Sequence, residues 1–174
     1  LRALSLQQQL LRAAVLACDL TDEQQRGDLL DRAHDALGGL DAMVHAAGVA
    51  THQSLGDIDD VSLRLQLEVN FVSALRLCEQ ALSTLDDGGA IVLVGSTLAQ
   101  APVATSAVYS ATKAALVAMM KSVALAGAAR SIRANVVTPG VVDTAMIRQP
   151  RPGQTAAEVV QTLAALHPLG LGEP

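Results

Sequence analysis

Short apolar runs alternate with longer amphipathic stretches along this chain. The apolar runs cover residues 13–18, 42–45, 90–94 and 133–137, and each is compact and aliphatic. None shows the strict alternation of a strand with one wet face, which favours strands that are covered on both faces of a parallel sheet. Strands that alternate with helical stretches predict βα units and therefore an α/β fold.

Helices are predicted between and after these strands, over residues 22–37, 60–85, 106–129 and 156–166. The first begins at Thr21-Asp22-Glu23, a typical N-terminal capping sequence, and ends at Gly38-Gly39, a typical stop. The stretch 106–129 is rich in alanine and apolar almost all round, which is unusual for a helix on the surface of a monomer. We therefore expect a homo-oligomer, a dimer or tetramer, that associates through helices 60–85 and 106–129.

The composition favours a single folded domain whose partner is a small molecule. The 174 residues are 51% hydrophobic, which is enough to bury a core. The net charge is −5, and the chain has one Tyr, one Phe and no Trp, so we expect neither a nucleic-acid partner nor an anionic membrane surface. No stretch is expected to span a membrane, because Lys121 interrupts the most apolar helix.

The two cysteines predict a reducing compartment. Cys18 and Cys78 lie in apolar stretches and have neither the spacing of a zinc site nor that of a disulfide framework, so no metal site is predicted. The first residues lack the basic region, apolar run and cleavage site of a secretory signal. We expect a cytoplasmic protein.

Small and polar residues follow each predicted strand, where an open α/β sheet binds its ligands. They are Asp19 after the first strand, Ala46-Ala47-Gly48 after the second, Gly95-Ser96-Thr97 after the third and Thr138-Pro139-Gly140 after the fourth. The carboxyl edge of the sheet is therefore the predicted place of the chemistry.

Tyr109 and Lys113 lie four residues apart in a predicted helix, so both side chains share one helix face, about 6 Å apart along the axis. A phenol has a pKa of about 10, and a neighbouring ammonium stabilises the phenolate and lowers that pKa. Tyr109 is then able to exchange a proton with a substrate oxygen. On spacing alone, a surface pair without function is the more frequent explanation.

Two further polar residues accompany this pair. Ser96 lies thirteen residues before Tyr109 at a strand end, where its hydroxyl can bind a carbonyl oxygen that the phenol also reaches, although a plain turn residue is the alternative. Asn70 interrupts an apolar helical stretch, where it is either a satisfied interior amide or a functional one.

Together these residues resemble the motifs of the short-chain dehydrogenase/reductase family, in the same order and over nearly the whole chain. Asp19 matches the family's adenine-binding aspartate, His45-Ala46-Ala47-Gly48 its Asn-Asn-Ala-Gly motif, and Asn70 its active-site asparagine. The other matches are Ser96 for the catalytic serine, Tyr109 and Lys113 for the Tyr-x-x-x-Lys pair, and Pro139, Gly140 and Thr144 for the Pro-Gly-x-x-x-Thr segment beside the nicotinamide.

The resemblance implies a single, partial Rossmann-like domain over residues 1–174, a doubly wound parallel sheet with helices on both faces in a three-layer αβα arrangement. The implied activity is NAD(P)-dependent hydride transfer between the cofactor and a ketone or secondary alcohol, with NAD or NADP left open. It implies that Tyr109 is the general acid or base, that Ser96 orients the substrate oxygen, that Lys113 lowers the phenol pKa and holds the ribose, and that Asn70 anchors a water. The implied cofactor-binding residues are Asp19, Ala47, Gly48, Tyr109, Lys113, Pro139, Gly140, Val142 and Thr144.

The sequence departs from the family pattern in two places. His45 and Ala46 replace the two asparagines of the motif, and we assign His45 no role in the chemistry. The chain also contains no Gly-x-x-x-Gly-x-Gly segment for the pyrophosphate, and its end resembles the family's segment before the last helix and strand. We expect the ordered core of a longer polypeptide, with residues 143–166 as a mobile lid on the substrate side.

Two other functions stay open at this point. A dehydrogenase-like domain can serve as a non-catalytic binding or assembly module, which the intact set of Asn70, Ser96, Tyr109 and Lys113 disfavours. A hydrolase with Ser96 as nucleophile and Lys113 as base ranks last, because Gly95-Ser96-Thr97 lacks the Gly-x-Ser-x-Gly elbow.

Overall fold

A three-stranded parallel sheet forms the centre of the computed structural model, which describes residues 13–148, 155–168 and 170–172. The strands are β1 (Ala42–His45), β2 (Ala90–Val94) and β3 (Arg133–Val137), in the order β1-β2-β3. Met43 pairs with Ile91, and Ile91 pairs with Ala134. These bounds confirm three of the four predicted strands and the parallel α/β arrangement.

The first predicted strand, over residues 13–18, is wrong. Residues 13–18 form no strand, and Val15 is 39% exposed. A strand needs a neighbour for its backbone hydrogen bonds, and a local apolar run does not supply one. The described sheet has the order β1-β2-β3, and residues 13–18 pair with neither of its edge strands.

The first predicted helix forms as two pieces, α2 (Glu23–Gly27) and α3 (Leu29–Leu37), with a break at Asp28. Asp22 caps α2 as predicted, because its side chain accepts hydrogen bonds from the backbone N–H groups of Gln24 and Gln25. Gly38 ends α3 in the left-handed conformation, with φ of 76°. The predicted caps are therefore correct, and the internal break was not predicted.

The second predicted helix is interrupted as well. It consists of α4 (Asp60–Leu67), a π-helical turn (Glu68–Val72) and α5 (Ser73–Thr84). The remaining elements are a short 3₁₀ turn (Thr97–Ala99), α6 (Ala107–Gly127), a second 3₁₀ turn (Ala128–Arg130) and α7 (Ala156–Ala165). Part of the predicted lid, residues 149–154, lies outside the described residues.

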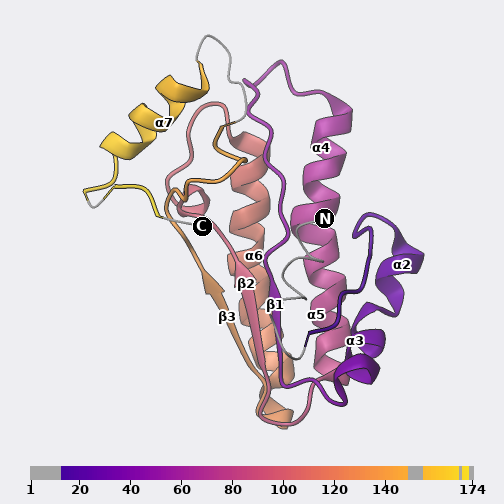
Figure 1. Cartoon of the computed structure of the whole chain (residues 1–174). Helices are drawn as coiled ribbons and strands as arrows, with labels where there is room; N and C mark the ends of the chain where they lie inside the picture. Colours follow the sequence, from indigo (N-terminus) through magenta and orange to yellow (C-terminus); the bar gives the residue numbers. More distant parts are fainter. Residues whose placement is uncertain (1–12, 149–154, 169, 173–174) are drawn as a thin grey trace.

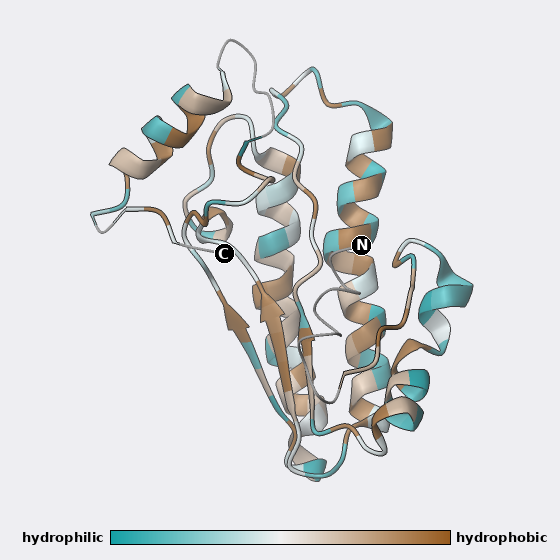
Figure 2. Ribbon diagram, viewed as in Figure 1, coloured by the Kyte–Doolittle hydropathy of each residue, from teal (hydrophilic) through white to brown (hydrophobic). Residues whose placement is uncertain are grey.

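Helices α4, α5 and α6 lie against one face of the sheet (Figure 1) and bury the core there. Figure 2 shows hydrophobic residues along the strands and mixed faces on the helices. The core joins Met43, Ile91 and Leu93 of the strands to Leu77 of α5 and Leu116 of α6. Residues 107–130 are long and apolar enough to cross a bilayer, but the packing of α6 against β3 identifies it as a core helix of the fold.

The opposite face of the sheet is open within the described residues. Val44 is 63% exposed and Val137 is 48% exposed, and both alternate with buried or half-buried neighbours along their strands. The described part of the chain therefore supplies the sheet and one helix layer of the expected three-layer arrangement.

Candidate active site

Lys113 and Tyr109 lie near the start of α6, beside the carboxyl ends of β1 and β2. Their side chains share one helix face as predicted, with Nζ of Lys113 5.6 Å from the centre of the Tyr109 ring. Lys113 is only 3% exposed, and its Nζ donates a hydrogen bond of 2.7 Å to the backbone oxygen of Val94. Helix α6 thus places the Lys113 ammonium group at the carboxyl end of β2.

Burial lowers the pKa of Lys113 from 10.5 to about 8. A buried ammonium is costly unless its three donors are used. Within the described residues, the oxygen of Val94 is the one hydrogen-bond acceptor of this group. Two donors are left for a ligand that carries oxygen atoms, such as a pair of ribose hydroxyls.

Tyr109 forms a side-chain hydrogen bond with Ser96, so the structure joins these two predicted residues. The pKa of Tyr109 is raised, because burial disfavours the phenolate more than the bond to Ser96 favours it. The expectation that Lys113 lowers this pKa stays a prediction, because the shift comes from burial and from Ser96. At neutral pH the Tyr109 hydroxyl is protonated and able to donate.

Ser96 lies directly after β2 and is 9% exposed. Its hydroxyl oxygen also accepts a hydrogen bond of 3.1 Å from the backbone N–H of Leu98, which caps the 3₁₀ turn that follows. The Ser96 side chain therefore both caps the turn and bonds to Tyr109. Among the described contacts, Ser96 bonds to Tyr109 and Leu98 while Lys113 bonds to Val94, so the Ser–Lys pair of the hydrolase hypothesis is not formed.

Asn70 is fully buried inside the π-turn, and its amide is satisfied. Its oxygen accepts from the backbone N–H of Val49 at 2.8 Å, and its nitrogen donates to the Val49 oxygen at 2.8 Å and to Thr112 Oγ1 at 3.2 Å. The side chain therefore fits the first of the two predicted alternatives, an interior amide. It fixes the loop after β1 against α6.

Gly48 places backbone without a side chain beside this cluster. A Cβ atom at this position would lie 3.4 Å from Lys113 Nζ and 3.5 Å from Asn70 Oδ1, so a side chain would fill the space beside the ammonium. Ala47 and Gly48 follow β1 as predicted. An open cradle next to spare ammonium donors fits the ribose of a nicotinamide cofactor, for which Lys113 would be the ligand.

The segment after β3 borders the same edge of the sheet. Thr97, one residue after Ser96, donates its backbone N–H to the Pro139 oxygen at 3.1 Å. His167, at the end of α7, accepts from the N–H of Val141 at 3.1 Å, and its ring would lie 2.8 Å from a Cβ atom on Gly140. Val142 forms a β-bridge with Gly172, and Thr144 begins a turn.

Asp19 lies apart from this cluster, in the loop before α2. Its carboxylate accepts hydrogen bonds from the N–H and hydroxyl of Thr21 at 2.9 and 2.8 Å, which lower its pKa. The side chain is exposed and charged at neutral pH. The structure thus brings Ser96, Tyr109, Lys113, Asn70 and Gly48 together and leaves Asp19 outside that hydrogen-bonded group.

Sequence reasoning missed two side chains that support the site. Thr112 donates to the backbone oxygen of Tyr109 at 2.7 Å and accepts from Asn70, so it connects α6 to the π-turn. His45 is 4% exposed and bonds to Ser73, although we assigned it no role. The replacement of an expected asparagine by His45 was the one signal in the sequence, and Thr112 left none.

We predict that the folded protein loses stability as the pH falls below about 6.5. The pKa of His45 is lowered from 6.5 by burial and by the charge of Lys113. In acid, the unfolded chain binds a proton at this side chain more readily than the folded chain, so protonation favours unfolding.

Urea titrations from neutral to mildly acidic pH measure this effect. The control is His45→Gln, which lacks the titrating group and whose stability is expected to depend less on pH in this window. The same acid dependence in both proteins would contradict the assignment to His45.

Comparisons with known proteins identify the family of this chain. A family model described as enoyl-(acyl carrier protein) reductase matches residues 2–173. The cis-4-hydroxycyclohexanecarboxylate dehydrogenase of Sinomonas cyclohexanicum is 35% identical over 91% of this chain, which spans 63% of that protein. The chain therefore covers less than two thirds of this curated relative.

Solved structures share the fold. A dehydrogenase/reductase from Sinorhizobium meliloti 1021 superposes with a TM-score of 0.85 and 31% identity, over 98% of this chain and 66% of its own. A blue fluorescent protein from a metagenomic library, solved in complex with NADPH, superposes with a TM-score of 0.76 and 32% identity, over 90% of this chain and 62% of its own. These likenesses confirm the doubly wound Rossmann class, and the chain belongs to the short-chain dehydrogenase/reductase family.

Proposed function

We propose that the protein is an NAD(P)-dependent oxidoreductase that acts on a ketone or secondary alcohol. The observation that carries the proposal is the junction of three groups at one sheet edge: a Tyr109 hydroxyl hydrogen-bonded to Ser96, with a buried Lys113 ammonium on the same helix face. This junction combines a proton donor, a hydroxyl that can orient a carbonyl and a cation with spare donors.

Each residue has a role in this proposal. Tyr109 donates its proton to the substrate oxygen during reduction and takes it back during oxidation. Ser96 holds that oxygen within reach of the phenol, and Lys113 holds ribose hydroxyls in the cradle beside Gly48. The raised pKa of Tyr109 favours the protonated phenol and so suits the reducing direction at neutral pH. A nicotinamide, when bound, supplies the hydride.

The cofactor-binding set extends beyond this junction in the proposal. Ala47 and Gly48 after β1, and Pro139, Gly140, Val142 and Thr144 after β3, border the nicotinamide half, while Asp19 contacts the adenine. Support for NAD(P) comes from the relative whose structure was solved with NADPH. The named hydroxy acid dehydrogenase among the relatives supports a substrate with a ring or chain hydroxyl. The choice between NAD and NADP stays open.

Cofactor binding and turnover test this function together. The full-length protein is titrated with NADH and NADPH by isothermal calorimetry and then mixed with a panel of cyclic and acyclic ketones while cofactor fluorescence is followed. The proposal predicts saturable binding of at least one cofactor and its oxidation by at least one ketone. Binding without oxidation across the panel would favour the alternative, a non-catalytic binding or assembly domain.

We also propose a homo-oligomer, a dimer or tetramer, through α4, α5 and α6. The outward face of α6 exposes Ala111, Ala114 and Ala118, and Leu125 is 80% exposed. Val61 on α4 is 77% exposed. Such small and apolar faces on two neighbouring helices suit close packing against a second copy.

A shallow apolar groove of about 500 Å³ lies on the same side, lined by Leu55, Leu98, Pro102, Val103 and Ala111 among others. Ala111 is two residues after Tyr109, about 200° around the helix, so this groove faces away from the proposed chemistry. We assign it to the subunit interface rather than to the substrate.

We predict that Ala111→Glu dissociates the oligomer, because it buries a carboxylate in an apolar contact. Light scattering coupled to size-exclusion chromatography measures the mass. The matched control, Ala36→Glu, places the same charge on an exposed site of α3 and is expected to leave the mass unchanged. A monomeric parent protein, or an unchanged mass for Ala111→Glu, would contradict the proposed interface.

The proposal places the protein in the cytoplasm, without nucleic-acid or membrane partners. Cys18 and Cys78 are both free, which suits a reducing compartment. Residues 143–166 are proposed to cover the substrate side. His167 supports this placement, because it ties the end of α7 to the backbone of Val141.

A further inference from the structure

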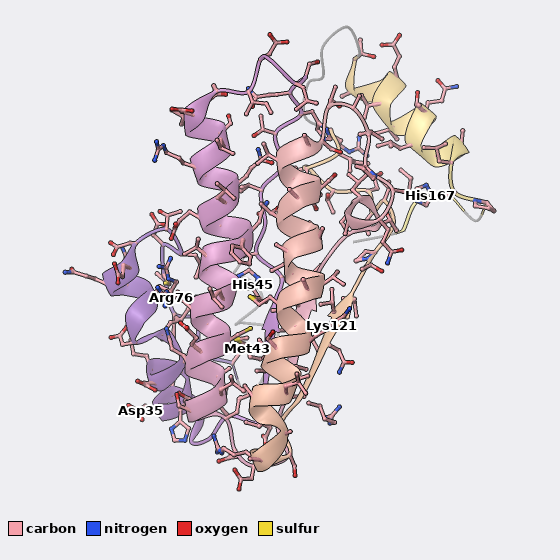
Figure 3. The ribbon with its side chains drawn as sticks, turned by 180° about the vertical axis from the view of Figure 1, so that it is seen from behind. Asp35, Met43, His45, Arg76, Lys121 and His167 are labelled. Carbon is pink, nitrogen blue, oxygen red and sulfur yellow. The ribbon has the colours of Figure 1, made fainter. Side chains whose placement is uncertain are left out.

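His45 is a buried histidine at the end of β1 for which the proposed chemistry has no use. It is 4% exposed, and in Figure 3 it lies in the region between the α4–α5 helix and α6. Its Nε2 atom is 3.0 Å from the hydroxyl of Ser73, the first residue of α5. The two residues are 28 positions apart in the sequence, so the bond joins the strand to the helix.

The direction of the hydrogen bonds at Ser73 can be worked out. The Ser73 hydroxyl donates to the backbone oxygen of Val69 at 2.7 Å, which uses its single proton. The same oxygen must then accept from His45, so Nε2 of His45 carries a proton and donates it. A neutral imidazole protonated at Nε2 is consistent with the lowered pKa of this residue.

This hydrogen-bond chain coincides with the π-turn. In a regular α-helix the Val69 oxygen would accept from the backbone N–H of Ser73, four residues later. Here the N–H of Ser73 bonds instead to the oxygen of Glu68, five residues earlier. The Ser73 hydroxyl, oriented by His45, bonds to the Val69 oxygen in place of that N–H.

The π-turn in turn sets the position of Asn70. From this turn, Asn70 holds the backbone of Val49 beside Gly48 and donates to Thr112, whose hydroxyl donates to the backbone oxygen of Tyr109. His45 is therefore connected to the helix turn that carries Tyr109 by hydrogen bonds through Ser73 and Thr112, joined by the Val69–Asn70 backbone. π-turns within helices are frequent at functional sites.

We propose that His45 is a positioning residue that acts through Ser73 to hold the π-turn and Asn70 in register with Tyr109 and Lys113. The inference rests on the proposed oxidoreductase function. It assigns His45 no contact with substrate or cofactor. It predicts that the donor at position 45 and the hydroxyl at position 73 act as one unit.

Kinetics of four variants of the full-length protein test this unit. His45→Leu removes the donor, Ser73→Ala removes the hydroxyl, and His45→Gln offers a replacement donor. Because small displacements of a catalytic group reduce rate strongly, we expect His45→Leu and Ser73→Ala each to lower kcat by about tenfold or more, with KM for the cofactor little changed. The double variant is expected to lose no more than either single variant, and His45→Gln to recover part of the rate.

The matched control is Ser83→Ala. Ser83 lies on the same helix, is exposed, and its hydroxyl donates to the backbone oxygen of Gln80 at 2.8 Å. The substitution therefore removes the same type of bond away from the π-turn. We expect its kcat to equal that of the parent.

Hydrogen exchange gives a readout that needs no turnover. The amides of Val49 and Ser73 are expected to exchange faster in His45→Leu and to regain protection in His45→Gln. Unchanged kcat and unchanged exchange at Val49 in folded His45→Leu would overturn the inference, as would fully additive losses in the double variant. If the parent itself neither binds nor oxidises the cofactor, the proposed function fails, and the exchange experiment still decides whether His45 holds the π-turn.

Discussion

Replacing Tyr109 with phenylalanine is expected to lower turnover by about 10²- to 10⁴-fold while cofactor affinity stays nearly unchanged. Phenylalanine keeps the ring, which lies 5.6 Å from Lys113 Nζ, and removes the hydroxyl that bonds to Ser96. Proton transfer to the substrate oxygen is lost, whereas the cradle beside Gly48 and the ammonium of Lys113 remain. The loss is expected in kcat rather than in the cofactor dissociation constant.

Steady-state kinetics and calorimetric titration of the cofactor separate these two quantities. Ser110→Ala is the matched control, because it removes a buried hydroxyl from the adjacent position of α6, where Ser110 bonds to Ser106 at 2.8 Å. We expect the control to keep most of the turnover. Turnover of Tyr109→Phe within a few-fold of the parent would eliminate Tyr109 as the acid.

Replacing Arg26 with methionine is expected to lower the free energy of unfolding by about 3 kcal/mol, the lower end of the range for breaking a buried ion pair. Arg26 is 4% exposed, and its guanidinium lies 2.8 Å from the Glu68 carboxylate and also donates to the Leu20 oxygen. The variant leaves Glu68 without its cation and Leu20 without its donor. Glu68 is 33% exposed, so water screens part of the loss.

Urea unfolding followed by circular dichroism measures the change. The control is Arg76→Met, whose hydrogen-bonded ion pair with Glu79 has a similar distance of 2.9 Å but lies on the surface, where both side chains are 55% exposed. Exposed pairs contribute about 0–1 kcal/mol, so this variant is expected to unfold close to the parent. Equal losses in the two variants would show that the burial of Arg26 does not determine its contribution to the free energy of unfolding.

The sequence predicted three strands to the residue, because each is a compact aliphatic run that a parallel sheet buries. Residues 13–18 have the same composition, yet they form no strand, since pairing depends on a neighbour elsewhere in the chain. The π-turn was not predictable from the sequence pattern either. Helical periodicity over 60–85 is nearly continuous, and the interruption depends on the Ser73 hydroxyl and on His45 of a distant strand.

The sequence predicted that some of these side chains lie together, but not their behaviour. The spacing of Tyr109 and Lys113 placed them correctly on one helix face. The direction of the Tyr109 pKa was not predictable, because burial is a property of the folded chain and outweighs the neighbouring groups. Asn70 illustrates the same limit, since only the fold reveals that its amide is occupied by Val49 and Thr112.

Deuterium transfer tests the central proposal most directly. The full-length protein is incubated with a ketone and with NADPH or NADH that carries deuterium at both C4 positions of the nicotinamide, and the alcohol is analysed by mass spectrometry. We predict one deuterium on the carbinol carbon with the parent protein and almost none with Tyr109→Phe. Saturable cofactor binding with no deuterium in the product, for any ketone of the panel, would contradict the proposed hydride transfer.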